Sequence, residues 1–148
     1  MGAVGEILGA IAVVLTLVYL ANQLRENTKS LKVQSLESSF QDWNQSLAEL
    51  QSPHGVGRAL MKAQSEQELS KEEMHELGFW YRRVLNINDK VQYLHSIGAA
   101  DSYNFDAFHR NMPTIVGNSF FVDWWGHHRG RYSERYQNYI DEFLKGNA

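Results

Sequence analysis

Cysteine is absent from the chain of 148 residues, and proline occurs only twice. Without cysteine the chain cannot form a disulfide framework, a zinc–thiolate site or a thiol nucleophile. The few prolines, together with seven Tyr, seven Phe and four Trp, indicate an ordered, aromatic-rich domain and not a disordered tail. A net charge of −3 gives no reason to expect a nucleic-acid-binding protein.

Charged residues are also missing from the segment Ile7 to Leu24. At about 1.5 Å per residue, a helix over this segment is about 27 Å long, close to the hydrocarbon thickness of about 30 Å. We therefore predict that residues 1–24 form one transmembrane helix. The alternative for so short an apolar run is a helix buried in a protein core.

The marks of a cleaved signal peptide are missing too. Such a peptide has a basic start and a small-x-small cleavage site. Here the charged side chain before the apolar run is Glu6, and the run ends in Tyr19-Leu20-Ala21-Asn22. Basic side chains follow the run instead, at Arg25, Lys29 and Lys32. The positive-inside rule therefore predicts a single-pass protein whose C-terminal domain lies in the cytoplasm.

Small residues recur on one face of the predicted membrane helix. At helical spacing Gly5, Gly9, Ala12 and Thr16 share this face, and Gly5 with Gly9 forms a GxxxG pair. Small side chains let helix backbones approach closely in lipid, so we predict that this face is an oligomer interface. The alternative is that these residues reflect the ordinary composition of membrane helices.

Three polar residues raise the alternative of a pore. In a ring of such helices, Gln23 and Asn27 would line the opening and Glu6 would concentrate cations at a mouth. A carboxylate in the headgroup layer costs little free energy, so Glu6 is more simply explained as a solvated residue at the end of the span.

Nothing interrupts the helix after Leu24 until Ser52-Pro53-His54-Gly55, so residues 25–52 are predicted to extend it into the cytoplasm. The polar stretch between Arg25 and Lys32 suggests a neck that is solvated or at headgroup level. Beyond it, apolar residues repeat at the intervals of three and four that mark one buried helix face: Val33, Leu36, Phe40, Trp43, Leu47 and Leu50.

Residues 53–148 are predicted to form the remaining helices of a small cytoplasmic bundle. The capping box Ser70–Glu73 begins a long helix that ends near Gly98. Other helices are predicted over residues 56–64 and 102–111, from 113 to a stop at Gly126, and from 133 onward. Since no alternating strand pattern occurs, the predicted fold is all-α.

A basic cluster follows the pair Trp124-Trp125 and comprises His127, His128, Arg129 and Arg131. We predict that this cluster contacts lipid headgroups or a phosphate group, and the alternative is a solvated linker. Adjacent helical residues cannot both face fully inward. One of the two tryptophans is therefore expected at an oligomer interface, where this residue type is enriched.

Two carboxylate–histidine pairs, Glu72-x-x-His75 and Asp106-x-x-His109, have the spacing that di-iron bundles use. The pattern is incomplete, because one carboxylate is Asp and no lone core Glu accompanies the pairs. We therefore expect no metal, no cofactor and no catalytic residue.

Two parts of the chain resemble a known pattern. The residues 6–14 (EILGAIAVV), 17–21 (LVYLA) and 23–28 (QLRENT) resemble the N-terminal signature of an uncharacterised family of small bacterial single-span membrane proteins. Near the C-terminus, a weaker similarity to the same family is carried by Trp124-Trp125, Arg129, Tyr132-Ser133 and Tyr139-Ile140-Asp141. The resemblance implies bacterial origin, hence the inner membrane, an all-helical fold and no assigned catalytic residue.

These patterns favour a membrane-anchored helical protein that self-associates and acts as a scaffold or accessory subunit. Its expected partners are the lipid bilayer, further copies of the same chain through the membrane helix, and a larger membrane complex, with no nucleic acid. Two alternatives remain open at this stage: a homo-oligomeric ion channel and a membrane-tethered enzyme.

Overall fold

The computed structural model describes residues 2–52 and 55–146, and within these ranges every regular element is helical. The all-α prediction is thus confirmed. In chain order the elements are α1 (Gly2–Leu50), α2 (Val56–Gln64), α3 (Lys71–Ser96), α4 (Ser102–His109), α5 (Met112–Val116), α6 (Ser119–His128), the 3-10 turn η1 (Arg129–Arg131) and α7 (Glu134–Gly146).

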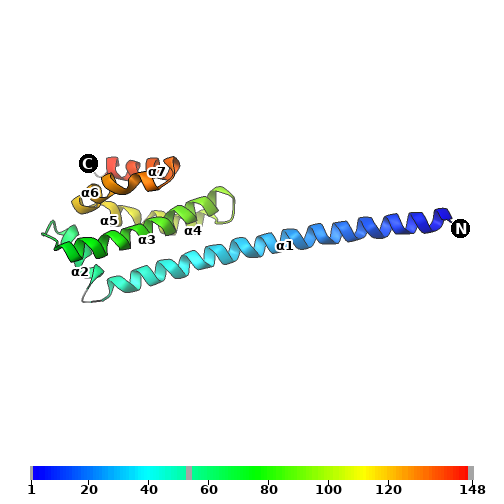
Figure 1. Ribbon diagram of the computed structural model, residues 1–148, viewed down its shortest axis with the longest axis horizontal. Helices are drawn as coiled ribbons and strands as arrows, with labels where there is room; N and C mark the ends of the chain where they lie inside the picture. Colours follow the sequence, from blue (N-terminus) through cyan, green and yellow to red (C-terminus); the bar gives the residue numbers. More distant parts are fainter. Residues whose placement is uncertain (1, 53–54, 147–148) are drawn as a thin grey trace.

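Helix α1 is continuous over 49 residues and has two different environments. Every side chain from Gly2 to Leu31 is exposed, whereas Ser39, Trp43 and Ser46 in the second half are buried. The other helices lie along one side of this second half, and the first half projects away from them (Figure 1). The predicted continuity of residues 2–50 as one helix is therefore seen. The predicted break after it includes Pro53 and His54, which lie outside the described residues.

Helix α3 packs antiparallel against the second half of α1. Trp80 Nε1 donates to the Ser46 carbonyl oxygen at 3.1 Å, and the guanidinium of Arg83 pairs with Glu49. The hydroxyls of Ser39 and Ser46 bond carbonyl oxygens one turn back in their own helix, at 3.0 and 2.9 Å. Both hydroxyls thus have hydrogen-bond acceptors within α1, and their small size allows α3 to approach closely.

The apolar stripe expected on α1 is therefore correct only in part. Trp43 is buried, but Val33 is 59% exposed and Leu47 is 39% exposed. The two small serines occupy buried positions instead, and at Ser46 the indole of Trp80 reaches the α1 backbone. Hydrophobicity alone could not identify this face.

The α1–α2 crossing depends on a glycine. At Gly57, an added Cβ would overlap the Leu50 carbonyl oxygen, so only glycine allows α2 to cross the end of α1 at this distance. The predicted helix over residues 56–64 matches α2. The predicted capping box is also present, since the Ser70 hydroxyl accepts from the Glu73 amide and the Glu73 carboxylate accepts from the Ser70 amide.

The helix predicted from residue 113 to Gly126 is wrong in two respects. The chain forms two helices here, α5 and α6, which are separated at Gly117–Asn118. Asn118 begins α6 by accepting a hydrogen bond from the Phe121 amide at 2.9 Å. Gly126 lies inside α6 and does not end it, because the packing of this helix outweighs the low helix propensity of glycine.

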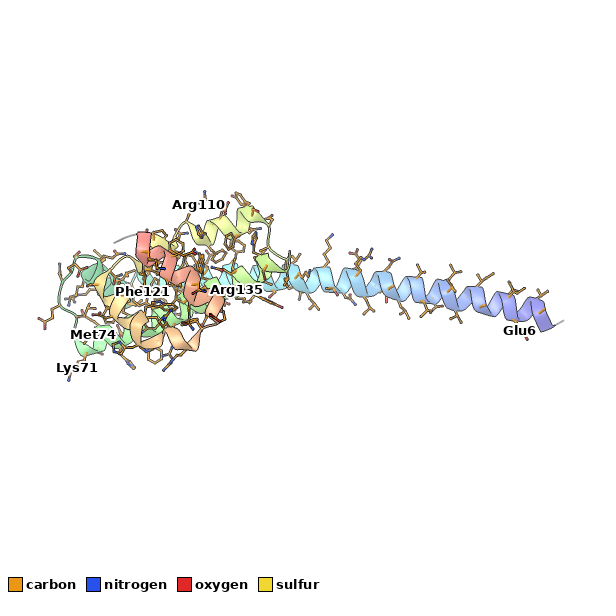
Figure 2. All side chains as sticks on the ribbon, turned by 90° about the horizontal axis from the view of Figure 1, so that it is seen from above. Glu6, Lys71, Met74, Arg110, Phe121 and Arg135 are labelled. Atoms are coloured by element: carbon orange, nitrogen blue, oxygen red, sulfur yellow. The ribbon has the colours of Figure 1, made fainter. Side chains whose placement is uncertain are left out.

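Both tryptophans of α6 are buried, with exposed fractions of 8% for Trp124 and 2% for Trp125. The prediction that one of them faces an oligomer partner is therefore wrong. Helix α6 is enclosed on two sides: Trp124 packs on Gly78 of α3, and Trp125 packs on Tyr132. The aromatic core extends from here to Phe121, which lies inside the domain (Figure 2).

Candidate functional site

The exposed first half of α1 is the most unusual surface of the molecule. It is one candidate membrane span by length and composition. Its large apolar side chains are between 47% and 67% exposed from Val4 to Leu24. A soluble monomer rarely exposes so long an apolar surface, so this segment requires a lipid or protein environment.

The predicted interface residues Gly5, Gly9, Ala12 and Thr16 all lie on this exposed segment. At about 100° per residue they fall within about 60° of one another around the helix axis. A Cβ added at Gly5 or Gly9 would meet nothing within 4 Å, so the face is uncovered. The Thr16 hydroxyl donates to the Ala12 carbonyl oxygen at 2.8 Å, which leaves this face smooth and without an unsatisfied donor.

Two of the three polar residues share that face and one does not. Gln23 and Asn27 lie in line with Gly5, whereas Glu6 is turned by about 100° from it. Gln23 Nε2 donates to the hydroxyl of Tyr19 at 2.6 Å. Glu6 lies near the free end of α1, far from the folded domain (Figure 2). The structure thus does not bring Glu6 together with the other two.

The small-residue face and the folded domain lie on opposite sides of α1. Counted at about 100° per residue, the buried positions Ser39, Trp43 and Ser46 are about 160° around the axis from Gly5. The helices packed on α1 therefore leave the face of Gly5 and Ala12 free along its whole length (Figure 1). On this face beyond the apolar segment lie exposed residues with uncharged side chains, Ser30, Gln34 and Gln41.

The basic cluster after α6 makes contacts within the domain. His127 Nδ1 and His128 Nδ1 lie 2.8 and 2.7 Å from carbonyl oxygens of their own helix, and the His128 ring stacks on Trp124 at 4.5 Å. Arg129 pairs with Asp141 at 2.5 Å. Arg131, at the end of η1, is exposed. The expected contact of this cluster with a headgroup or phosphate remains a prediction, with one of its charges already paired.

Asp141 connects Trp125 and Arg129 at the junction between α6 and α7. Its carboxylate accepts from Trp125 Nε1 at 2.8 Å and from the Arg129 guanidinium at 2.5 Å. Ser133 caps α7 by accepting from the Tyr136 amide at 3.3 Å. These contacts join the end of α6 to α7.

Several tyrosine hydroxyls of the domain lie in its interior, and two of them are hydrogen-bonded to asparagine side chains. Burial raises the pKa of Tyr81, Tyr132 and Tyr139 to about 12. The Tyr81 hydroxyl accepts from Asn118 Nδ2 at 2.9 Å, and the Tyr136 hydroxyl donates to Asn88 Oδ1 at 2.9 Å. A raised pKa means that these phenols keep their protons at neutral pH.

The two carboxylate–histidine pairs are not brought together. His75 packs on Phe79 with ring centroids 4.6 Å apart, and His109 Nδ1 lies 3.0 Å from the Tyr139 hydroxyl. Over residues 2–52 and 55–146, no group of three or more His, Asp or Glu is placed to hold a metal ion. In this part of the chain the pairs form no shared site.

Comparison of the chain with protein-family models, with curated proteins and with solved structures gives no match. The function proposed below therefore depends on the geometry of this chain.

Proposed function

We propose that the protein is a membrane-anchored helical scaffold or accessory subunit that self-associates through α1. The observation that carries this proposal is the opposition of two faces on one continuous helix. The helical domain covers one side of α1, while the face of Gly5, Gly9, Ala12 and Thr16 is uncovered on the other side. Two copies can therefore meet along α1 without any clash between their domains.

The residues on this face support close packing in lipid. Glycine and alanine allow helix backbones to approach, and such packing is a main source of helix association in membranes. The Thr16 hydroxyl is satisfied within its own helix, so it adds no cost of burial at an interface. The exposed amides of Gln34 and Gln41 would continue the contact outside the bilayer, where polar interfaces are common.

The proposed location is the inner membrane of a bacterium, with a single span. Arg25, Lys29 and Lys32 follow the apolar segment, so the positive-inside rule puts the helical domain in the cytoplasm. In this orientation the domain is held next to the membrane, where it would present its surface to a larger membrane complex.

An ion channel is the second candidate, because Gln23 and Asn27 lie on the same face as the small residues. Two observations favour the scaffold instead. The Gln23 side chain already donates to Tyr19, so it does not require water in a pore. Glu6 is turned by about 100° from Gly5 and would not point to the axis of a ring. Planar-bilayer recordings with the purified chain test this candidate, and a reproducible cation conductance would favour it.

Site-directed crosslinking in membranes tests the scaffold directly, because the chain has no cysteine of its own. Single variants Ala12→Cys and Thr16→Cys probe the small-residue face. The matched controls Val14→Cys and Val18→Cys are also at exposed positions but lie roughly on the opposite side of the helix. We expect oxidation to give disulfide-linked dimers for the first two variants and few for the controls.

A second measurement uses native mass spectrometry in mild detergent. We expect the unmodified chain to be oligomeric, Gly9→Leu to be mostly monomeric, and Val14→Leu to behave like the unmodified chain. A chain that is monomeric throughout, or equal crosslinking on both faces, would contradict the proposal.

A further inference from the structure

Three basic side chains lie on one face of α1 directly after its apolar segment. At about 100° per residue, Arg25, Lys29 and Lys32 fall within about 60° of one another, on the side of the helix that faces the domain. Within the described residues, no ion pair involves any of the three. Their positive charge is therefore available to a ligand.

The turn between α3 and α4 lies next to these side chains, although it is remote in sequence. Lys32 Nζ donates to the Ile97 carbonyl oxygen at 3.3 Å. The turn is the end of the domain nearest to the first half of α1 (Figure 1). Gly98 has φ of +66°, a left-handed conformation that lets the chain reverse here after α3.

Helix α1 and this turn enclose an open hollow of about 420 Å³, which we call the neck hollow. It is lined by Leu24, Arg25, Thr28, Lys29, Lys32 and Gly98. The lining thus combines three cationic groups with one leucine at the end of the apolar segment. The Thr28 hydroxyl donates to the Leu24 carbonyl oxygen at 2.8 Å, and Lys32 donates to Ile97. Within the described residues, Arg25 and Lys29 are therefore the cations of the neck hollow whose donors are not engaged.

The position of the neck hollow along α1 matches the headgroup layer of a bilayer. If Leu24 ends the hydrocarbon region, then Arg25 lies about 1.5 Å and Lys29 about 7.5 Å beyond it along the helix. The polar layer on each side of a bilayer is about 5–7 Å thick. Arg25 therefore lies within this layer and Lys29 at its outer edge, whereas Lys32 lies about 12 Å beyond Leu24, outside the layer.

We propose that the neck hollow binds the phosphate of an anionic phospholipid. Arg25 and Lys29 contact the phosphate, and Lys32 holds the α3–α4 turn beside it. The lipid is favoured over free phosphate because Leu24 lines the hollow and because Ile97 and Tyr103 are exposed in and after the turn, with 41% and 77% of their surface accessible. An apolar side chain and a tyrosine are suited to the interfacial layer.

This site rests on the membrane anchoring proposed above and is independent of self-association. Bound lipid would also fix the domain at a defined angle to the membrane, because the hollow is made by both α1 and the domain. By contrast, Arg129 in the other basic cluster is paired with Asp141. The neck hollow is therefore the better anion site of the two.

The test uses the purified full chain in mild non-ionic detergent, with native mass spectrometry to count bound lipid. Phosphatidylglycerol and phosphatidylcholine with identical acyl chains are added separately. The variant Arg25→Gln/Lys29→Gln removes two cations, and Arg25→Lys/Lys29→Arg conserves them. The matched control Lys71→Gln/Lys145→Gln removes two exposed cations elsewhere, one of them at the far end of the domain (Figure 2).

Each basic side chain near an anionic surface strengthens binding about fivefold. We therefore expect the Gln/Gln variant to bind phosphatidylglycerol about 25-fold more weakly than the unmodified chain. The charge-conserving variant and the Lys71/Lys145 control should keep the affinity, and phosphatidylcholine should bind weakly throughout. Inorganic phosphate in millimolar excess should not displace the lipid.

Equal binding of the two lipids would overturn the proposal, as would full retention of phosphatidylglycerol by the Gln/Gln variant or an equal loss in the control. Displacement of the lipid by inorganic phosphate would assign the neck hollow to the free anion, and it would also overturn the proposal of a lipid site. The same spectra measure the oligomeric state of the chain. Extraction of native membranes at alkaline pH tests whether the chain is anchored in the membrane. Failure of the lipid site is therefore distinguishable from failure of the scaffold.

Discussion

The ammonium group of Lys32 donates to the carbonyl oxygen of Ile97 at 3.3 Å, across a sequence separation of 65 residues. This contact joins the neck of α1 to the C-cap residue of α3, at the helix end where carbonyl oxygens lack partners within the helix. A cation at the C-terminal end of a helix is also favoured by the helix dipole. The contact therefore fixes the point at which α1 leaves the folded domain.

The proposed contact between copies is expected to continue beyond the apolar segment of α1. Gln34 and Gln41 are exposed and lie in line with Gly5 around the α1 axis. We expect Gln34→Cys and Gln41→Cys to form disulfide-linked dimers in membranes, and Asn138→Cys on the exposed surface of α7 to form few. Dimers at Ala12→Cys without dimers at Gln34→Cys would restrict the interface to the bilayer.

Gly57→Ala is expected to lower the free energy of unfolding by about 1–3 kcal/mol, because the added Cβ forces α2 away from the Leu50 carbonyl. Gly126→Ala is the matched control. A Cβ there meets nothing within 4 Å, and the residue lies inside α6, so we expect a stabilisation of about 0.5–1 kcal/mol. Denaturant unfolding followed by tryptophan fluorescence measures the free energy of unfolding of both variants. A change of the same sign in the two variants would contradict the prediction.

Asn118→Ala is expected to cost about 1–3 kcal/mol, since it removes the cap of α6 and leaves the buried Tyr81 hydroxyl without its partner. Tyr81→Phe removes the other half of the pair. The double variant should cost less than the sum of the single variants, because the unsatisfied hydroxyl is then absent. Strict additivity of the three unfolding free energies would show that the pair is not coupled.

The free energy of unfolding is expected to fall as the pH rises above 10. Tyr81, Tyr132 and Tyr139 have folded-state pKa values of about 12, raised by burial from the ordinary value of 10.0. Between these values the unfolded chain loses protons that the folded chain keeps, so stability is complete below pH 10 and declines toward pH 12. Denaturant titrations between pH 8 and about 12 measure the decline.

Tyr132→Phe separates this effect from general alkaline damage. The Tyr132 hydroxyl has no hydrogen-bond partner among the described residues, so its removal should cost little at neutral pH. We expect the variant to lose stability less steeply above pH 10. An unchanged slope would show that this phenol titrates normally in the folded protein.

Local patterns in the sequence predicted much of the fold. Ser70 and Glu73 form the capping box expected from their spacing, and the helix over residues 56–64 has the expected bounds. These features depend on neighbouring residues, which the sequence places side by side. The break before α6 was missed, although Gly117-Asn118 is a turn signal and Asn118 is a good N-cap residue.

Features that depend on distant segments were not predictable. Ser39 and Ser46 are buried, and Trp80 of α3 reaches the α1 backbone at Ser46. No helix-face pattern within α1 indicates this. Likewise, the basic residues after the apolar segment were expected to set the topology. Their proximity to Gly98 comes only from the return of α3 along α1. The neck hollow is thus a tertiary feature.

The number of residues in α1 between Gly5 and the buried Ser39 sets the direction of the small-residue face relative to the domain. Because the helix has no break from Gly2 to Leu50, the direction of the domain around the axis is set by the number of intervening residues. Inserting one residue near Ala21 would turn the domain by about 100°, whereas inserting seven would turn it by only about 20° and raise it by about 10 Å. Relatives that keep the same assembly should therefore differ in this segment by multiples of seven residues or of eleven.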